Sequence, residues 1–436
     1  MIGRIGLHSF IRLFLDYIGY NVLGFVYSVV LFWSYPTLHY WVSFHAFRYE
    51  NFEYSEALIG FVLAWIVVLA SSFVKHPIYR FFNSAFAFSV FIPSLVLFPY
   101  FNSSLLYDGS VSLIFFSSVL LSFLGLIAGS HTTVRPPISL TMKEYTVLVG
   151  ATSLVATALI LFIFRNIFSI ASIADVYYQR AIYSDNKNIF SYLIHWQMMV
   201  FSPFCIFLGT TRNNLTLIGL GFLGVVAVYG ITAFKAAPAI AALVYLLAQF
   251  RIFETVFRFR IVVPFAFLTI FCGIFYYDLL IADFPLLSYY ILDRSFVGTG
   301  IMQLMTLEHF RNLPNALWGG SFLSFLFEDI YGEDPFLLLG QSFFGTEVRA
   351  NSGFFADGFI NFGSAGILIM TVLSAITLLI TSILLNRFPL RFMFLVLPYA
   401  FGFINGPLQV TLLTNGLMLF WAFVLLYPTR SDEVLR

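Results

Sequence analysis

The chain has 436 residues, 60% of them hydrophobic and only 10% charged, with a formal net charge of +1 and a mean hydropathy of +0.92. Soluble domains average about 25% charged residues, so this composition excludes an ordinary soluble protein and indicates a polytopic membrane protein. Aromatic residues make up 20% of the chain, which suits helices in a bilayer with Tyr and Trp at the interfaces. Cys205 and Cys272 both lie in apolar runs, so we expect no disulfide framework.

A membrane-spanning helix needs roughly 20 apolar residues, and about twelve segments of the chain meet that requirement. The predicted spans are 13–33, 57–74, 82–101, 111–130, 145–165, 191–211, 214–233, 237–250, 261–277, 358–385, 390–405 and 408–428. No internal repeat, low-complexity stretch or removable signal peptide is visible. We therefore expect an all-α protein with a single integral membrane domain over residues 1–436.

Lysine and arginine predict the orientation, because they are concentrated in cytoplasmic loops. With the N-terminus inside, the inner loops and termini hold 14 of the 22 basic residues, and both termini are cytoplasmic. Two outer segments, 166–190 and 278–357, are then unusually long, and loops of such length usually carry function. The spacing of apolar residues within 278–357 predicts amphipathic helices on or near the membrane surface. We expect the chemistry on this outer face.

The predicted outer face is acidic overall, so individual cations must bind any phosphate group there, and the planar fork of Arg suits that task. The candidates are Arg180, Lys235, Arg294 and Arg349. Three of them also have an ordinary interpretation. Lys235 can be a helix-end lysine that reaches the interface, and Arg180 and Arg294 can form loop ion pairs with Asp175 and Asp293.

Metal binding is the rival scheme. Carboxylates are the ligands that Mg²⁺ or Mn²⁺ prefers, but acidic runs of this kind are usually solvated loop surface. The run in question contains Glu328, Asp329, Glu333 and Asp334. The seven histidines show no paired ligand spacing; His195, just inside a predicted span, can be a base or an interfacial residue. We find no P-loop, no GxGxxG and no GxSxG motif.

Over roughly residues 170–425 the chain resembles the Wzy-type O-antigen polymerases, which form a broader group with the O-antigen ligases. The resemblance lies in the layout of spans and long outer loops and in short motifs taken in order. These motifs are Tyr177–Arg180, Lys235–Pro238, Arg294–Phe296, Gly345-Thr346-Glu347 with Asn351 and Phe354-Phe355-Ala356, and the segment PYAFGFINGPLQVTLLTNGLMLFW. One family pattern is absent: an Arg followed after ten residues by Gly, which from Arg180 reaches Ser191 and from Arg349 reaches Ile360.

The resemblance implies a GT-C-like glycosyltransferase of the bacterial inner membrane that acts at the periplasmic face. Its donor would be a glycan on undecaprenyl pyrophosphate, and its acceptor a single repeat unit on another such lipid. No cofactor, metal or nucleic acid is implied, whereas a chain-length regulator and other O-antigen assembly proteins are implied partners. Besides the bilayer itself, these are the partners that we expect.

The chemistry requires cations for the leaving pyrophosphate and a base for the attacking hydroxyl. We assign pyrophosphate binding to the four cations named above. Glu347 is the first choice for the base, followed by Asp357 and His195. Secondary contacts to substrate are expected from Tyr178, Arg311 and Asn351.

Three alternatives stay open, of which a structural membrane scaffold fits the long outer loop worst. The first is an O-antigen ligase, which would transfer the glycan from the same lipid to a lipid A core and which sequence separates poorly from a polymerase. The second, from a different class, is a polysaccharide transporter or flippase. Transporters often show internal repeats and charges near the bilayer midplane, whereas here only Asp16 lies well inside a span.

Overall fold

The computed structural model describes residues 7–41, 53–127, 140–172, 175–250, 258–282, 284–320, 324–345, 349–350 and 353–428. Within these ranges every regular element is helical, which confirms the all-α prediction for the described part of the chain.

Nine helical segments in the described ranges are long and apolar enough to cross a membrane. They are Phe14–Trp41 within α1 (Leu7–Trp41), Tyr54–Ser72 (α2), Pro77–Phe101 (α3, η1 and α4), Ser110–Ile127 (α6), Met142–Ile163 (α7), Ser191–Thr211 (α9, η3 and α10), Leu215–Thr232 (α11), Val262–Leu280 (α14) and Phe354–Leu385 (α17). Each overlaps one predicted span, as expected for a polytopic membrane protein.

The three remaining predicted spans coincide with shorter apolar helices. These are α12 (Ala236–Gln249), η5 with α18 (Leu390–Leu395 and Leu397–Asn405), and η6 with α19 (Val410–Thr414 and Leu417–Leu426). A continuous helix of about 20 residues is the usual length of a span, and each of these is shorter or interrupted.

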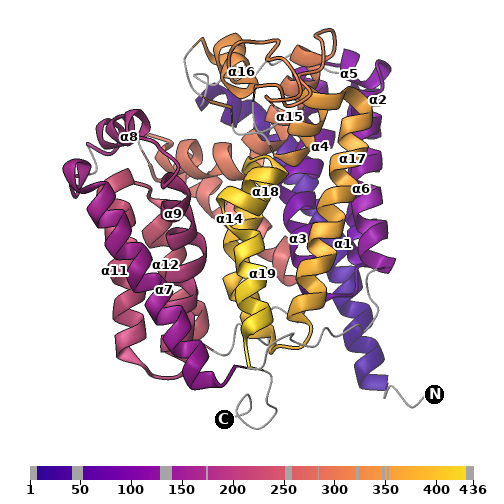
Figure 1. Ribbon diagram of the computed structural model, residues 1–436. Helices are drawn as coiled ribbons and strands as arrows, with labels where there is room; N and C mark the ends of the chain where they lie inside the picture. The colour runs from indigo at the N-terminus through magenta and orange to yellow at the C-terminus, as the bar shows by residue number, and fades with distance from the viewer. Residues whose placement is uncertain are drawn as a thin grey trace. The chain divides into compact units, whose positions relative to one another are not determined.

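The chain forms two compact units. Unit 1 comprises Met1–Ser130, Val256–Ile380 and Phe403–Leu408, and unit 2 comprises His131–Thr255, Thr381–Gly402 and Gln409–Arg436. In unit 1, α2 packs against α1, α4 and α6 (Figure 1). In unit 2, α10 packs against α11 and α12, and α11 packs against α7.

The interior of unit 1 contains a helix that the sequence places at a surface. The π-helix η4 (Ser288–Val297) continues into α15 (Gly298–Phe310), and ten of the thirteen residues of α15 are buried. A Cβ atom on Gly300 would lie 2.5 Å from the Cβ of Pro93, so only glycine permits this close approach to α4. α15 therefore lacks the exposed face of an amphipathic helix, because its small and apolar residues pack against α4 and η1 (Ala87–Phe91). Its location at the membrane surface stays a prediction.

The long helix α17 is broken near its start. Phe362 and Gly363 have non-helical backbone angles, and Gly363 has φ +61° and ψ −148°, a conformation that only glycine adopts without strain. On either side of the break, Gly358 and Gly366 approach so closely that a Cβ on Gly358 would lie 2.5 Å from the carbonyl oxygen of Gly366. Carbonyl groups at the break, of Ile360 and Asn361, accept hydrogen bonds from the backbone of loop 316–317.

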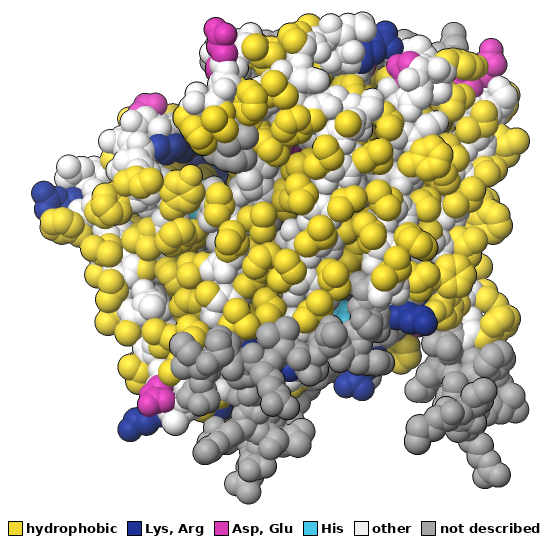
Figure 2. Space-filling model, turned by 45° about the vertical axis from the view of Figure 1, so that its right-hand side comes forward, with side chains coloured by type: hydrophobic (Ala, Val, Ile, Leu, Met, Phe, Trp, Pro, Cys, Tyr) yellow, Lys and Arg dark blue, Asp and Glu magenta, His cyan; other side chains and the backbone are white. Residues whose placement is uncertain are grey.

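The surface fits a bilayer. On the face drawn in Figure 2, hydrophobic side chains cover the middle of the helices, and charged side chains lie towards the helix ends. Such a belt matches the charge-poor hydrocarbon core of a membrane, with charged groups left to the headgroup regions.

Candidate functional site

The tight turn between α11 and α12 is the centre of the site in unit 2. α11 ends at Thr232, and its C-cap residue Ala233 has a left-handed φ of +51°, a costly conformation for a residue with a Cβ. Phe234 follows, and its backbone N–H donates to Thr232 Oγ1 at 3.1 Å. Lys235 is the N-cap residue of α12. Strained backbone of this kind is concentrated at functional sites, which is one reason to examine this turn.

Helix α8 (Val176–Asp185) places Arg180 on this turn. The buried Gln179 amide donates to the Ile167 carbonyl at 2.6 Å and to the Ile231 carbonyl at 3.1 Å, which fixes α8 against the end of α11. The neighbouring Arg180 donates from Nε and Nη2 to the Ala233 carbonyl, at 3.4 Å each. Its guanidinium carbon also lies 5.8 Å from the centre of the Phe234 ring. The structure thus brings Arg180 and Lys235 to the same turn.

Lys235 occupies an unfavourable place for a cation. The N-terminus of a helix carries partial positive charge, so a lysine there is repelled, whereas an anion is attracted by both. The side chain of Lys235 is exposed. The ordinary interpretation, a lysine that reaches the interface, explains its exposure but not its position at a helix N-terminus.

His195 approaches the same turn from the α9 helix (Ser191–Trp196). Its ring lies 5.9 Å from the Phe234 ring, centre to centre, and its Nδ1 atom is buried with no hydrogen-bond partner. A buried polar atom usually has a partner, so an imidazole nitrogen without one is an unused donor or acceptor beside two cations.

Lys187 is a third cation at this site, and the sequence analysis does not select it. Its Nζ lies 5.8 Å from the centre of the Tyr183 ring, and Tyr183 in turn packs edge-on against Phe234 at 5.7 Å. Burial raises the pKa of the Tyr183 hydroxyl, so this ring stays neutral between the cations. The signal in the sequence is spacing: Arg180, Tyr183 and Lys187 follow a helical i, i+3, i+7 pattern.

The three cations are not paired with carboxylates of the described residues. Arg180, Lys187 and Lys235 form no ion pair within the described ranges. Asp175, the proposed ion-pair partner of Arg180, instead accepts a hydrogen bond from Ser172 Oγ at 2.6 Å. The loop ion pair is therefore not the explanation for Arg180.

Arg294 lies in unit 1 on η4. It is exposed, and its guanidinium carbon lies 5.9 Å from the centre of the Tyr290 ring. The adjacent Asp293 is only 6% exposed, and burial raises its pKa to about 7, although the Arg294 charge acts in the opposite direction.

Two other arginines of unit 1 are neutralised by carboxylates. Arg349 Nε lies 2.8 Å from Asp334 Oδ2, and Asp334 is also the N-cap of α16 (Pro335–Phe344). Arg311 Nη1 lies 2.9 Å from Asp108 Oδ2. Both arginines were predicted to contact substrate, and an anion would have to compete with an acid already in place.

Asp357 is part of the break in α17. It is 3% exposed and accepts hydrogen bonds from Trp318 Nε1 at 3.3 Å and from Asn361 Nδ2 at 3.1 Å. These contacts give it a structural task, to hold loop 316–318 against the broken helix. Two predicted residues, Glu347 and Asn351, lie outside the described residues.

The remaining predicted groups are at the surface. Tyr178 is 71% exposed and points away from the buried face of α8 that Gln179 anchors. In the acidic run, Asp329 accepts hydrogen bonds from the backbone of Tyr331 and Gly332, both at 3.2 Å, while Glu328 and Glu333 are exposed.

The arrangement in unit 2 can bind an anion of more than one charge. Three cations and a helix N-terminus surround two aromatic rings, and an unpartnered imidazole nitrogen lies at the same turn. Comparison of the chain with protein-family models, with curated proteins and with solved structures finds no match.

Proposed function

We propose that the protein is a membrane glycosyltransferase of the O-antigen polymerase type. It would transfer a growing glycan from undecaprenyl pyrophosphate to the non-reducing end of a repeat unit carried by a second undecaprenyl pyrophosphate. The support is the resemblance in motif order together with the site in unit 2.

One observation carries the proposal: Arg180 and Lys235, far apart in sequence, meet at a single turn without a carboxylate partner. A pyrophosphate group fits such a site because it needs several fixed donors, and both Arg and a helix N-terminus supply them. Lys187 lies over the Tyr183 ring and adds a third charge, and it has no carboxylate partner among the described residues. The apolar helices below the turn suit the polyprenyl tail.

The site residues would act on a substitution at the anomeric carbon. An acceptor hydroxyl oxygen forms the new bond to that carbon, and the bond from the carbon to the pyrophosphate oxygen breaks. The pyrophosphate leaves with the electron pair, and fixed cations stabilise the charge that develops on it. The hydroxyl proton passes to a base. Among the described candidates, His195 is the one that lies beside the cations, while Glu347 remains the first candidate from sequence.

The proposal includes a topology. The end of unit 2 that carries α8 and the α11–α12 turn would face the periplasm, with both termini in the cytoplasm. The three shorter apolar helices would complete twelve crossings, in a GT-C-like arrangement in the bacterial inner membrane. The positive-inside distribution of Lys and Arg supports this orientation.

A lipopolysaccharide gel of the host bacterium tests the proposal. Deletion of the gene should leave a single repeat unit on the lipid A core, and Arg180→Ala or Lys235→Ala should reproduce that pattern at normal protein level. Arg165→Ala is the matched control, because Arg165 is an exposed cation of the same unit that stacks on Phe162 away from the turn.

The outcomes separate the alternatives. Loss of every repeat unit in the deletion strain would indicate a ligase or flippase and contradict the polymerase. A full ladder from the Arg180→Ala strain would remove the unit 2 site from the reaction. Loss of polymer with Arg165→Ala as well would show that general charge, rather than the turn, matters.

A further inference from the structure

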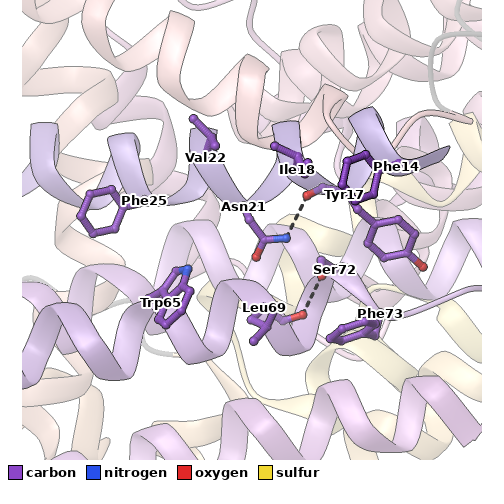
Figure 3. A pocket seen from close by; sticks show the side chains of 10 residues that line it. All are labelled: Phe14, Tyr17, Ile18, Asn21, Val22, Phe25, Trp65, Leu69, Ser72 and Phe73. Atoms are coloured by element: carbon purple, nitrogen blue, oxygen red, sulfur yellow. Dashed lines mark hydrogen bonds between the residues drawn. The ribbon is translucent and has the colours of Figure 1, made fainter. Parts of the chain in front are cut away.

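A groove on unit 1 lies between α1 and α2. It has a volume of about 580 Å³, in the range typical of ligand pockets. Phe14, Ile18 and Val22 line one side, and Trp65 and Leu69 line the other. In Figure 3, Phe14, Ile18 and Val22 come from α1, and Trp65 and Leu69 come from the neighbouring α2.

The lining of the groove is mostly apolar; the donors of Asn21 and Ser72 bond to their own helices, while the Asn21 Oδ1 atom is buried without a partner. Asn21 lies between the two helices in Figure 3, and its Nδ2 donates to the Tyr17 carbonyl at 2.8 Å. Ser72 likewise donates to the Leu69 carbonyl at 2.7 Å. Val22 and Trp65 are 53% and 49% exposed, and they belong to helices long and apolar enough to cross a membrane. The medium that fills such a groove is the hydrocarbon of the bilayer.

One end of the groove is basic. The Arg260 guanidinium carbon lies 4.3 Å from the centre of the Tyr17 ring, which lines the groove. Its Nη1 donates to the Ser72 carbonyl and, at 2.7 Å, to the Val74 carbonyl at the end of α2. Arg260 therefore joins both walls, and it forms no ion pair within the described residues.

Further cations surround this end. Lys75 and Arg258 are exposed, and the buried Arg80 donates to the Arg258 carbonyl at 2.9 Å. The Asp16 carboxylate is engaged by the backbone N–H groups of Arg260 and the following residue, at 3.0 and 3.1 Å, rather than by these side chains. Asp16 supplies one negative charge against the four cations Lys75, Arg80, Arg258 and Arg260, so positive charge is in excess at this end of the groove.

We propose that this groove binds an anionic glycerophospholipid, with an acyl chain between α1 and α2 and the phosphate at Lys75 and Arg258. Charge complementarity selects the headgroup, since basic clusters at the ends of membrane helices attract anionic lipids by about 1 kcal/mol per cation. Arg260 would attract the phosphate through its charge rather than by a direct hydrogen bond from Nη1, because that atom already donates to carbonyl groups. The occupant is a bilayer lipid and is independent of the proposed reaction.

Native mass spectrometry of the detergent-purified protein tests the site, with phosphatidylglycerol and phosphatidylcholine of identical acyl chains as probes. The native protein should bind phosphatidylglycerol about 30-fold more tightly, which is the effect of two cations at about 1 kcal/mol each. Lys75→Ala/Arg258→Ala should remove this preference and leave phosphatidylcholine binding unchanged. Lys143→Ala/Arg165→Ala, which removes two exposed charges outside both sites, should keep it.

Filling the groove tests the acyl-chain position. Val22→Trp should weaken binding of both lipids at least tenfold, and Leu69→Trp provides the same test from the other wall. Val155→Trp is the matched control, because Val155 is a similarly exposed valine on α7. Equal binding of the two lipids by the native protein would overturn the headgroup assignment. Unchanged binding in both tryptophan variants, with normal size-exclusion profiles, would overturn the groove as the site.

Discussion

Two arginines of unit 1 and two cations of unit 2 differ in their partners. In unit 1, Arg311 and Arg349 each have a carboxylate within 2.9 Å. In unit 2, Arg180 and Lys235 meet at one turn and have none among the described residues. All four are predicted from sequence as outer-face cations, so residue type and predicted location alone do not separate them.

The difference shows which cations are available to a ligand. An exposed ion pair has little net energy, yet its acid must be displaced before an anion binds. A cation without a partner has no such competitor, and a helix N-terminus beside it adds to the attraction. Functional importance should therefore be greatest in unit 2 and smaller for the paired arginines.

Removing both cations of the turn should have the largest effect. Each charged hydrogen bond to phosphate contributes about 1.5–3 kcal/mol, so Arg180→Ala/Lys235→Ala should lower the polymerisation rate by about 10³-fold. The measurement is the rate of glycan extension by purified protein in lipid nanodiscs. A loss below tenfold would show that the absence of an acid partner does not mark the site.

The free energy of unfolding should depend on pH through Asp293, a buried acid of unit 1. The folded state keeps the Asp293 proton up to a pKa of about 7, whereas an unfolded aspartate loses it near pH 4. Between these values the unfolded state binds fewer protons, so the free energy of unfolding should fall as the pH rises from about 4 to about 7, by on the order of 4 kcal/mol, and then level off.

Asp293→Asn is the control for that effect. The variant cannot ionise, so its unfolding free energy should match the native value near pH 4 and exceed it near pH 8. Denaturant unfolding in detergent at both pH values gives the difference between the two proteins. An identical pH profile for both would rule out Asp293 as the group responsible.

Asp357 should matter for stability first. Asp357→Ala removes the acceptor for Trp318 and Asn361, and we expect the free energy of unfolding to fall by about 3 kcal/mol. Asp357→Asn retains one acceptor and should recover part of this loss. If Asp357→Asn instead leaves stability unchanged and abolishes glycan extension, Asp357 is the base, as the sequence analysis allowed. A functionally important residue would then lie in unit 1 as well as in unit 2.

The smallest effect is expected at the paired arginine of unit 1. Arg349→Ala removes an exposed ion pair and should change the free energy of unfolding by less than about 1 kcal/mol. Glycan extension should fall by less than tenfold, well below the effect at the turn in unit 2. A loss comparable with that of Arg180→Ala would place Arg349 in the site despite its acid partner.

Apolar helices were the most predictable part of the fold. Nine predicted spans overlap helices of the required length, because about 20 apolar residues leave few other structures in a membrane. The position of α15 was not predictable, since its burial depends on Gly300 meeting Pro93, a contact between residues about 200 positions apart. The periodic spacing of apolar residues indicates which face of a helix is buried, and a helix that is buried on nearly all faces does not show such a pattern.

Part of the candidate site was predictable as well. Motif order selected Arg180 and Lys235, and the structure brings them to one turn. It could not select Lys187, whose relation to the site runs through the Tyr183 and Phe234 rings. Nor could it identify the acid beside Arg349, because Asp334 reaches it only through the fold of the α16 region.

The break at Gly363 also sets how α17 matches the thickness of a membrane. A straight helix from Phe354 to Leu385 has 32 residues and would be about 48 Å long, well beyond a hydrocarbon core of about 30 Å. The 22 residues from Ser364 to Leu385 measure about 33 Å, close to that thickness. The break therefore lets the preceding turns, which hold Asp357, leave the axis of the span, and α17 needs neither a steep tilt nor a locally thickened bilayer.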